Sequence, residues 1–397
     1  MSDKPRVVAI MGEFFPNSHA DVILTKYLKG FPTDEGVLEP RTKLVGMYVE
    51  QFGERDMAKK YSEEFGVPIF ESIRQTLMLG GKELGVDGVI SIGEHGDYPI
   101  DEMGRHMYPR RYFWEQICGV FASSGRVVPV FNDKHLSYNW DDAWWMYQRG
   151  KELNVPMLAG STLTLCWRNP WLEFDETPIT EALAIGFGGM EAYGYHTVET
   201  LQCMVERRKG GETGVKSVQC LVGDAVWKAG DAGLWSRELA EAAADRMINR
   251  PVGTMEQYCE NPEVFLIEYT DGLKAAILQL NGYARDFAFA AKTDKGIEST
   301  EFYLQYHREH THFAYLGLNI EEMFVTGEPP WPVERTLVAT GIINAVMDSA
   351  YQNHAKISTP GMANLAYSSY DKLPIRPTGF RPTPATLRQL DTLINKF

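Results

Sequence analysis

The sequence predicts an α/β protein with a Rossmann-type, doubly wound parallel sheet in its N-terminal part, followed by an α+β domain with a large, mostly antiparallel sheet. Up to about residue 160, short apolar runs alternate with longer amphipathic stretches, which is the pattern of βαβ units. Beyond that point, segments rich in β-branched and aromatic residues prevail. A chain of 397 residues is long enough for two domains. We therefore expect a dinucleotide-binding domain over 1–158 and a substrate-binding and oligomerisation domain over 159–397.

Most strands expected in the first part are continuous apolar runs, as in strands that are buried on both faces of a sheet. They are Val7–Met11, Lys43–Val49, Pro68–Phe70, Gly88–Ile92, Val127–Phe131 and Pro156–Ala159. The amphipathic stretches between them predict helices, and several end in front of Gly or Asn, as helices commonly do. They are Ala20–Leu28, Arg55–Phe65, Ile73–Leu79, Pro109–Ala122 and Asp141–Leu153.

The second part is expected to contain strands and helices. Val264–Tyr269 and Ala275–Leu280 are predicted to form a hairpin, because the dipeptide Asp271-Gly272 between them favours a tight turn. The apolar periodicity predicts a further strand, Phe287–Ala291. It also predicts three helices, Thr197–Arg207, Ser236–Met247 and Val333–Tyr351.

Composition narrows the class of partner. The chain has 39 basic and 53 acidic residues, a formal net charge of −14, which opposes binding to nucleic acid or to an anionic membrane and favours a small-molecule substrate. The five cysteines are scattered without CxxC spacing and are expected to be reduced core thiols. They are Cys118, Cys166, Cys203, Cys220 and Cys259. With no secretory signal pattern and no run of 18 apolar residues, we expect a cytoplasmic protein.

Several motifs occur in a fixed order along the chain. Asn132–Leu136 looks like a Glu-Lys-Pro motif at a strand end, Arg168 and Pro170 look like an Arg-x-Pro motif, and Gly194 and His196 look like a Gly-x-His motif that opens a helix. In these features the chain resembles the glucose-fructose oxidoreductase and inositol dehydrogenase family. The resemblance implies a nicotinamide cofactor, NAD or NADP, a sugar or polyol substrate, and a homodimer or homotetramer. It also implies that Lys134 reaches the substrate.

Other segments extend the resemblance over nearly the whole chain, and two positions depart from it. Met57–Ile69 resembles the second Rossmann helix with its Phe-Gly-Val-Pro ending, and Gly85–Val89 resembles the Val-Asp-x-Val strand. The family's glycine-rich GxGxxG loop is replaced by a segment, residues 12–19, with a single glycine. The aspartate expected four residues before the helix histidine is Ala192 here, which makes the neighbouring Glu191 the candidate to hold the imidazole.

Two short segments carry the expected cofactor contacts near the first two strands. Gly12 follows the first strand and precedes a helix, where a dinucleotide phosphate binds. Ser18 or Asn17 would donate to that phosphate, or would cap the helix. Glu50 ends the second strand, where a carboxylate accepts from both ribose hydroxyls and favours NAD over NADP, and its alternative is a solvated loop glutamate.

The ends of the fourth and fifth strands carry the ionisable groups of the expected crevice. Gly93, Glu94 and His95 end the fourth strand and Asp133 ends the fifth, and we expect them beside the cofactor. Lys134 is the expected catalytic lysine, because a partly desolvated lysine exchanges a proton near neutral pH, and the alternative is a plain surface lysine. His95 and His135 are expected to line the cleft or cap a turn.

The helix histidine is the second expected catalytic group. His196 would take the proton of a substrate hydroxyl while hydride leaves the same carbon, and its alternative is a helix-capping role. Arg168, Trp167 and Tyr195 are expected to bind substrate, since aromatic rings suit the apolar faces of a sugar ring, although they suit a core equally.

A histidine triplet, His307, His310 and His312, invites a metal interpretation. Neither a strand nor a helix places all three on one face, so no metal is expected there.

The favoured function is a nicotinamide-dependent oxidation or reduction at a CH–OH group of a sugar, a sugar derivative or a polyol. Two alternatives stay open. One is a glycosidase or lyase that keeps NAD tightly bound and oxidises the sugar transiently, and the other is a non-catalytic relative that senses a dinucleotide or a sugar.

Overall fold

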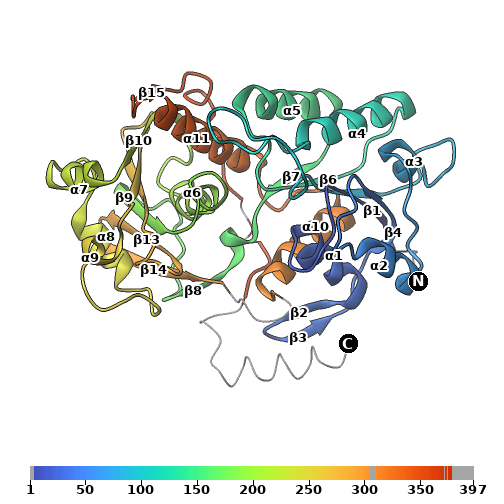
Figure 1. The fold of residues 1–397 in the computed structure, drawn as a ribbon, viewed down its shortest axis with the longest axis horizontal. Coiled ribbons are helices and arrows are strands. Elements are labelled where there is room, and N and C mark those ends of the chain that lie inside the picture. Colours follow the sequence, from blue (N-terminus) through green and yellow to red (C-terminus); the bar gives the residue numbers. More distant parts are fainter. Residues whose placement is uncertain (1–3, 305–309, 371, 373, 378–397) are drawn as a thin grey trace.

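The computed structural model describes residues 4–304, 310–370, 372 and 374–377, and it confirms both predicted sheets (Figure 1). The first sheet has five strands in the order β4-β1-β5-β6-β7, and every neighbouring pair is parallel. The strands are β1 (Arg6–Met11), β4 (Lys43–Val49), β5 (Gly88–Ile92), β6 (Val130–Asp133) and β7 (Met157–Gly160). This is a Rossmann-type order, in which the chain moves outward from β1 in both directions.

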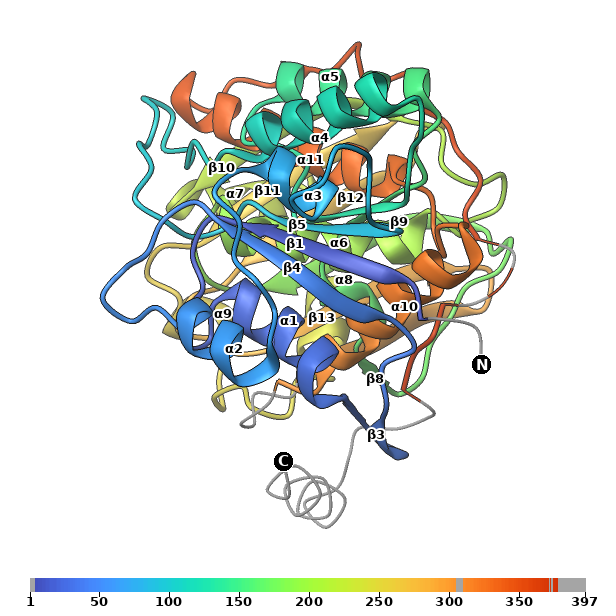
Figure 2. The same ribbon diagram turned by 90° about the vertical axis from the view of Figure 1, so that its right-hand side faces the viewer.

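Helices cover both faces of this sheet (Figure 2). In β1, Val7 and Ala9 pack into one apolar cluster with the first helix, and Val8 and Ile10 pack into another on the opposite face, because successive strand residues point to opposite sides. The helices of the N-terminal half are α1 (His19–Lys29), α2 (Ala58–Phe65), α3 (Ile73–Met78), α4 (Arg110–Ser124) and α5 (Trp140–Leu153). The sheet is therefore buried on both sides, as its continuous apolar strands predict.

The second sheet has eight strands in the order β15-β10-β11-β12-β9-β13-β14-β8. All neighbouring pairs are antiparallel except β12 with β9, and β11 and β12 form the hairpin predicted around Asp271 and Gly272. The strands are β8 (Trp167–Asn169), β9 (Ile179–Gly186), β10 (Val215–Val222), β11 (Glu263–Tyr269), β12 (Lys274–Gln279), β13 (Phe287–Thr293), β14 (Gly296–Tyr303) and β15 (Ile357–Ser358).

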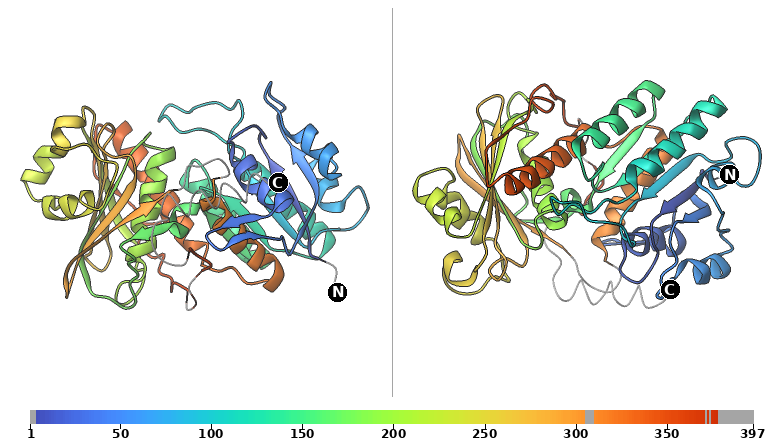
Figure 3. Two further views of the ribbon diagram at one scale, coloured as in Figure 1. Left: turned by 90° about the horizontal axis from the view of Figure 1, so that it is seen from below. Right: turned by 45° about the horizontal axis from the view of Figure 1, so that its top comes forward.

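Two groups of helices sandwich the large sheet (Figure 3). The outer face of the sheet packs on α7 (Asp224–Asp231), α8 (Arg237–Ala244) and α9 (Met255–Tyr258). The inner face, toward the Rossmann-type sheet, packs on α6 (Ala192–Val205) and α11 (Glu334–Tyr351). A 3-10 turn (Thr162–Leu165) links β7 to β8. The inner helices therefore form the layer between the two sheets.

Helix α10 (His312–Thr326) returns to the N-terminal half of the chain. It packs on α1 and on β2 (Phe31–Thr33), which pairs with β3 (Gly36–Leu38). Tyr27 Oη donates to Gly317 O at 3.0 Å across this contact. A segment from the second half of the sequence thus completes the first layer, while the division at residue 158 stays a prediction.

Several predicted elements have different bounds, most clearly the helix predicted as Thr197–Arg207, which is Ala192–Val205, and three differences in the first half have local reasons. Pro68–Phe70 is not a strand, since only Ile69 bridges to Met47, and Pro68 has no N–H to extend a ladder. The strand expected from Val127 begins at Val130, directly after Pro129. Helix α2 begins at Ala58 rather than at residue 55, because Asp56 accepts hydrogen bonds from the N–H groups of residues 58 and 59.

All five cysteines are buried and free of disulfides, as expected. Within the described residues, none of the helices has the length and apolarity needed to cross a bilayer.

A buried ion pair joins helices α6 and α11, and the C-terminal segment donates hydrogen bonds to it. Arg335 of α11 donates to both carboxylate oxygens of Glu206 at the end of α6, with Nε–O distances of 3.1 and 2.9 Å. Tyr367 Oη and Ser369 Oγ donate to the same carboxylate at 2.8 and 3.0 Å. Since both charged side chains are buried, each depends on the other for its compensation.

We predict that Arg335→Met lowers the free energy of unfolding by about 3–5 kcal/mol, because it leaves the Glu206 carboxylate buried without its cation. Guanidinium unfolding monitored by circular dichroism measures this. Lys216→Met is the matched control, since Lys216 pairs with Glu268 at 2.9 Å while 63% exposed, and we expect a loss of at most about 1 kcal/mol. Equal losses for the two variants would contradict the assigned role of the buried pair.

Candidate active site

The candidate site lies at the carboxyl ends of the parallel strands, where open α/β sheets bind ligands. Segments after β1, β5, β6 and β7 meet at this edge. The structure brings together four residues predicted from sequence, Glu94, His95, Asp133 and Lys134, and adds His19, which the sequence analysis did not single out.

Lys134 is buried within a charge cluster and is not a surface lysine. Its side chain is 3% exposed, and Nζ donates to Glu94 Oε1 at 3.0 Å. Arg110, at the start of α4, pairs with the other oxygen of Glu94. Burial alone would raise the pKa of Glu94, but Lys134 and Arg110 outweigh it and hold that pKa well below its usual range. The peptide bond between Lys134 and His135 is cis.

His19 and His95 lie beside this cluster. His19 Nδ1 is 2.7 Å from Asp133 Oδ2, and the His19 and His95 rings are in edge contact at 5.5 Å between centroids. Burial and the neighbouring His19 lower the pKa of His95 to about 4, so its imidazole is neutral at pH 7. His95 has a left-handed backbone, with φ of 67°.

His196 lies at the start of α6 and is oriented by a hydroxyl and a carboxylate. His196 Nδ1 is 3.1 Å from Ser161 Oγ, and Ser161 in turn contacts Glu199 one helical turn further on. Ser161 N and Tyr195 Oη also donate to Glu199, at 3.0 and 3.2 Å. Burial raises the pKa of Glu199. The sequence alone could not predict this Glu199–Ser161–His196 arrangement, because Ser161 follows β7 and is distant from α6 in sequence.

The expectation that Glu191 holds His196 is corrected. The Glu191 carboxylate accepts from the backbone N–H of His106 at 3.1 and 3.0 Å, and burial raises its pKa. Glu191 stands before the first residue of α6, whereas Glu199 lies within the helix, three positions after His196 and therefore on the same face.

His196 and Lys134 belong to one electrostatic site. Burial lowers the pKa of His196 well below its usual value, and the nearby Lys134 ammonium lowers it further. His196 is therefore a neutral imidazole near pH 7, able to accept a proton.

The loop between β1 and α1 uses its single glycine for packing. A Cβ on Gly12 would lie 2.4 Å from His95 O, so this position admits no side chain. Ser18 is the N-cap of α1 and accepts from the N–H groups of Phe15 and Asp21, which supports the capping alternative for Ser18. Gly93 is similarly constrained, since its Cβ would meet Arg110 Cγ at 2.7 Å.

Three features at this edge of the sheet suit a dinucleotide. A cavity of about 320 Å³ lies between the β1–α1 loop and the loop after β4, on the adenosine side of a Rossmann-type sheet, and it includes Phe15 and Arg55 in its lining. Glu50, half-buried at the end of β4, accepts from Tyr48 Oη at 2.5 Å and keeps a second oxygen. The first backbone N–H groups of an α-helix have no acceptor within the helix, so the start of α1 suits an anionic diphosphate. These features fit a dinucleotide, although without the glycine-rich turn.

The residues expected to bind substrate in the second half are buried. Trp167 is 0% exposed and makes an edge contact with Tyr315. Arg168 is also fully buried and donates to Glu173 at 2.6 Å and to Leu172 O at 2.8 Å. Tyr195 is buried, its hydroxyl donates to Glu199, and its ring contacts the His135 ring at 5.0 Å between centroids. Trp167 and Arg168 therefore have structural partners in place of an open face toward the crevice.

The histidine triplet is only partly described. His307 lies outside the described residues. His310 Nε2 is 3.1 Å from Asn17 Oδ1, and His312, the first residue of α10, is 5.8 Å from His310 between ring centroids.

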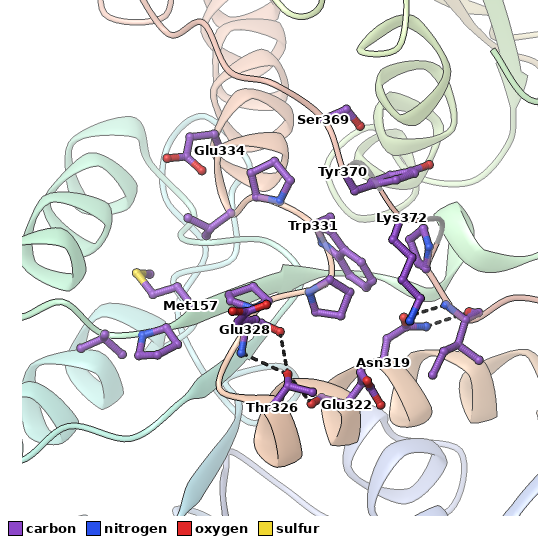
Figure 4. Close-up of a pocket in the computed structure, with 18 of the residues that line it drawn as sticks. Met157, Asn319, Glu322, Thr326, Glu328, Trp331, Glu334, Ser369, Tyr370 and Lys372 are labelled. Atoms are coloured by element: carbon purple, nitrogen blue, oxygen red, sulfur yellow. Dashed lines mark hydrogen bonds between the residues drawn. The ribbon is translucent and has the colours of Figure 1, made fainter. Parts of the chain in front are cut away.

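A second cavity, of about 800 Å³, lies apart from the candidate site (Figure 4). Its lining includes Trp331, Tyr370, Asn319 and Glu334, and none of the predicted site residues. Figure 4 shows the Trp331 and Tyr370 rings pointing into this space from two different segments.

These sheets define a mixed α/β fold with a Rossmann-type parallel sheet followed by a large, mostly antiparallel sheet, and solved structures share this fold. The chain resembles GenD2 from gentamicin A biosynthesis, solved with NAD, at 12% identity and a TM-score of 0.56, over 90% of this chain and 97% of that one. It also resembles scyllo-inositol dehydrogenase from Lactobacillus casei, at 11% identity and a TM-score of 0.56, over 90% of this chain and 99% of that one. Myo-inositol 2-dehydrogenase from Lactobacillus plantarum is similar at 12% identity and a TM-score of 0.54, over 89% of this chain and 99% of that one. No family model and no curated protein sequence matches. The resemblance expected from the motifs is thus confirmed in the fold.

We predict that buried histidines make stability depend on pH. Burial lowers the pKa values of His135 and His196 in the folded state, so below about pH 6.5 the unfolded chain binds protons that the folded protein does not. Stability then falls as the pH drops through this range, by up to about 1.4 kcal/mol per pH unit for each histidine. Urea unfolding of the native protein and of His196→Asn between pH 5 and 7.5 measures the difference in slope. Identical slopes would contradict the neutral buried state of His196.

Proposed function

We propose that the protein is a nicotinamide-dependent oxidoreductase acting on a CH–OH group of a sugar, a sugar derivative or a polyol. The observation that carries the proposal is the convergence of Lys134 and a neutral His196 at the carboxyl edge of a Rossmann-type sheet. The shared fold with the inositol dehydrogenases and with GenD2 supports it.

Oxidation of a secondary alcohol removes a proton from oxygen and a hydride from carbon, and leaves a carbonyl. In this proposal a nicotinamide ring, when bound, supplies the hydride acceptor. Glu50 would bind the adenosine ribose, which favours NAD, and the N-terminus of α1 would face the diphosphate. Lys134 would donate to the substrate oxygen and stabilise its negative charge as the proton leaves.

His196 receives that proton in the proposed reaction. Three donors, Ser161 N–H, Ser161 O–H and Tyr195 O–H, point at the Glu199 carboxylate. With the Ser161 hydroxyl donating to Glu199, Ser161 Oγ accepts from His196 Nδ1–H. This leaves Nε2 as the basic nitrogen of His196. Ser161 and Glu199 are positioning residues in this scheme, because they act through the imidazole.

Two glutamates on either side of His196 allow a matched test. We predict that Glu199→Gln lowers kcat by about 10- to 100-fold and shifts the acid limb of the kcat/KM profile, because the imidazole loses its orienting partner. Glu191→Gln should change kcat by less than about threefold, since Glu191 bonds to the His106 backbone. Steady-state kinetics over pH 5–9 measures both, with circular dichroism as the folding control. A larger loss in Glu191→Gln would contradict the assignment.

The function itself is tested by dinucleotide reduction. The native protein would be incubated with NAD⁺ or NADP⁺ and a panel of inositols, alditols and aldoses, and the absorbance of reduced nicotinamide followed. We expect turnover with at least one polyol or sugar, preferring NAD⁺, and loss of at least about 1,000-fold in Lys134→Met. No turnover on the panel, together with no thermal shift at saturating dinucleotide, would overturn the proposal.

A further inference from the structure

Three side chains at the edge of the sheet converge with the spacing of a metal site. His19, Glu94 and His95 each offer one ligand atom, and these atoms all lie within 4.8 Å of one another. His19 comes from the first turn of α1, and the other two residues follow β5. Two imidazoles and one carboxylate are a common ligand set for divalent transition metals.

The free nitrogens of both histidines are available as ligands. His19 contacts Asp133 Oδ2 through Nδ1, so Nε2 is its remaining ring nitrogen. A carboxylate behind a histidine fixes its tautomer and orientation, and metal-binding histidines are commonly held in this way.

Unpartnered buried atoms provide an independent observation. Among the residues that the structure describes, His95 Nε2 and Asp133 Oδ1 are buried atoms with no hydrogen-bond partner, and the Asp133 side chain is almost completely enclosed. Leaving a buried polar atom without a partner costs about 1–3 kcal/mol, so such atoms generally mark a missing partner. A cation bound to His19 and His95 would bind His95 Nε2 directly and would be attracted by Asp133 Oδ1.

The surrounding charges are balanced without the cation. Glu94 and Asp133 carry two negative charges, and Lys134 and Arg110 carry two positive ones. Each Glu94 oxygen accepts one hydrogen bond in this arrangement and keeps a second lone pair for a metal. A divalent ion would therefore add positive charge, which an oxygen anion in its open position would offset.

We propose that His19, Glu94 and His95 bind a divalent first-row transition-metal ion, with Asp133 orienting His19. Three protein ligands leave at least one open position, as in catalytic zinc sites. The open position lies beside Lys134, so it would take a hydroxyl or alkoxide oxygen of a substrate. This site does not depend on the dinucleotide, and its ligands are different residues from His310 and His312.

Zn²⁺ is the probe for the test, and the full chain is used without added dinucleotide. The protein is treated with a chelator, dialysed, and titrated with ZnCl₂ by calorimetry, and bound zinc is counted by mass spectrometry. We expect one ion per chain. His95→Ala and His19→Ala should each weaken binding by at least about 100-fold, and Asp133→Asn by about 10- to 100-fold.

His106→Ala is the matched control, because His106 stacks on Tyr108 and is not among the three converging side chains. We expect its zinc affinity to stay within about threefold of the native value. Circular dichroism checks that each variant folds, and the Co²⁺ absorption spectrum of the native protein provides a readout that needs no variant, with bands typical of nitrogen and oxygen ligands. Absence of a stoichiometric ion in the native protein, or equal affinity in His95→Ala, would overturn the proposal. Because dinucleotide is absent, either result leaves the oxidoreductase proposal to its own test.

Discussion

The Glu94 carboxylate is the constraint on which the candidate site depends. It lies between Lys134 and Arg110, which are themselves buried, so removing it would leave two cations in a low-dielectric environment without compensation. This arrangement fixes the start of α4 and the end of β6 relative to β5.

The site lacks two features of the family that the sequence resembles, the glycine-rich loop and the aspartate before the helix histidine, and other residues occupy their surroundings. In the proposed scheme Glu199 takes the place of the missing aspartate before His196, because Glu199 contacts Ser161, which in turn contacts His196. The missing glycines coincide with a loop in which Gly12 packs on the backbone of His95 and Phe15 packs on its ring. These changes shift the orienting groups to new residues and bring His19 and His95 to the edge where Lys134 lies.

The parallel sheet could be predicted from the sequence because its strands are continuous apolar runs, and the placement of Glu94 and Lys134 at its carboxyl edge could be predicted because they follow such strands. Strands β9 and β10 could not be predicted, because their mixed polar and apolar residues have no turn signal like Asp271-Gly272 beside them. Ser161 and His19 could not be predicted either, since nothing in a single sequence places a residue after β7 against α6, or the first turn of α1 against Asp133. Trp167 illustrates the opposite error, because an aromatic residue suits a core as well as a sugar, and here it is in the core.

Calorimetric titration of the native protein with NAD⁺ and NADP⁺ is the most direct test of a nicotinamide-dependent function, because it needs no knowledge of the substrate. We expect one dinucleotide site per chain, tighter for NAD⁺, and weakened in Glu50→Ala, which removes the carboxylate proposed to bind the ribose. No binding of either dinucleotide at millimolar concentration, by a protein shown to be folded, would contradict a nicotinamide-dependent function for this fold.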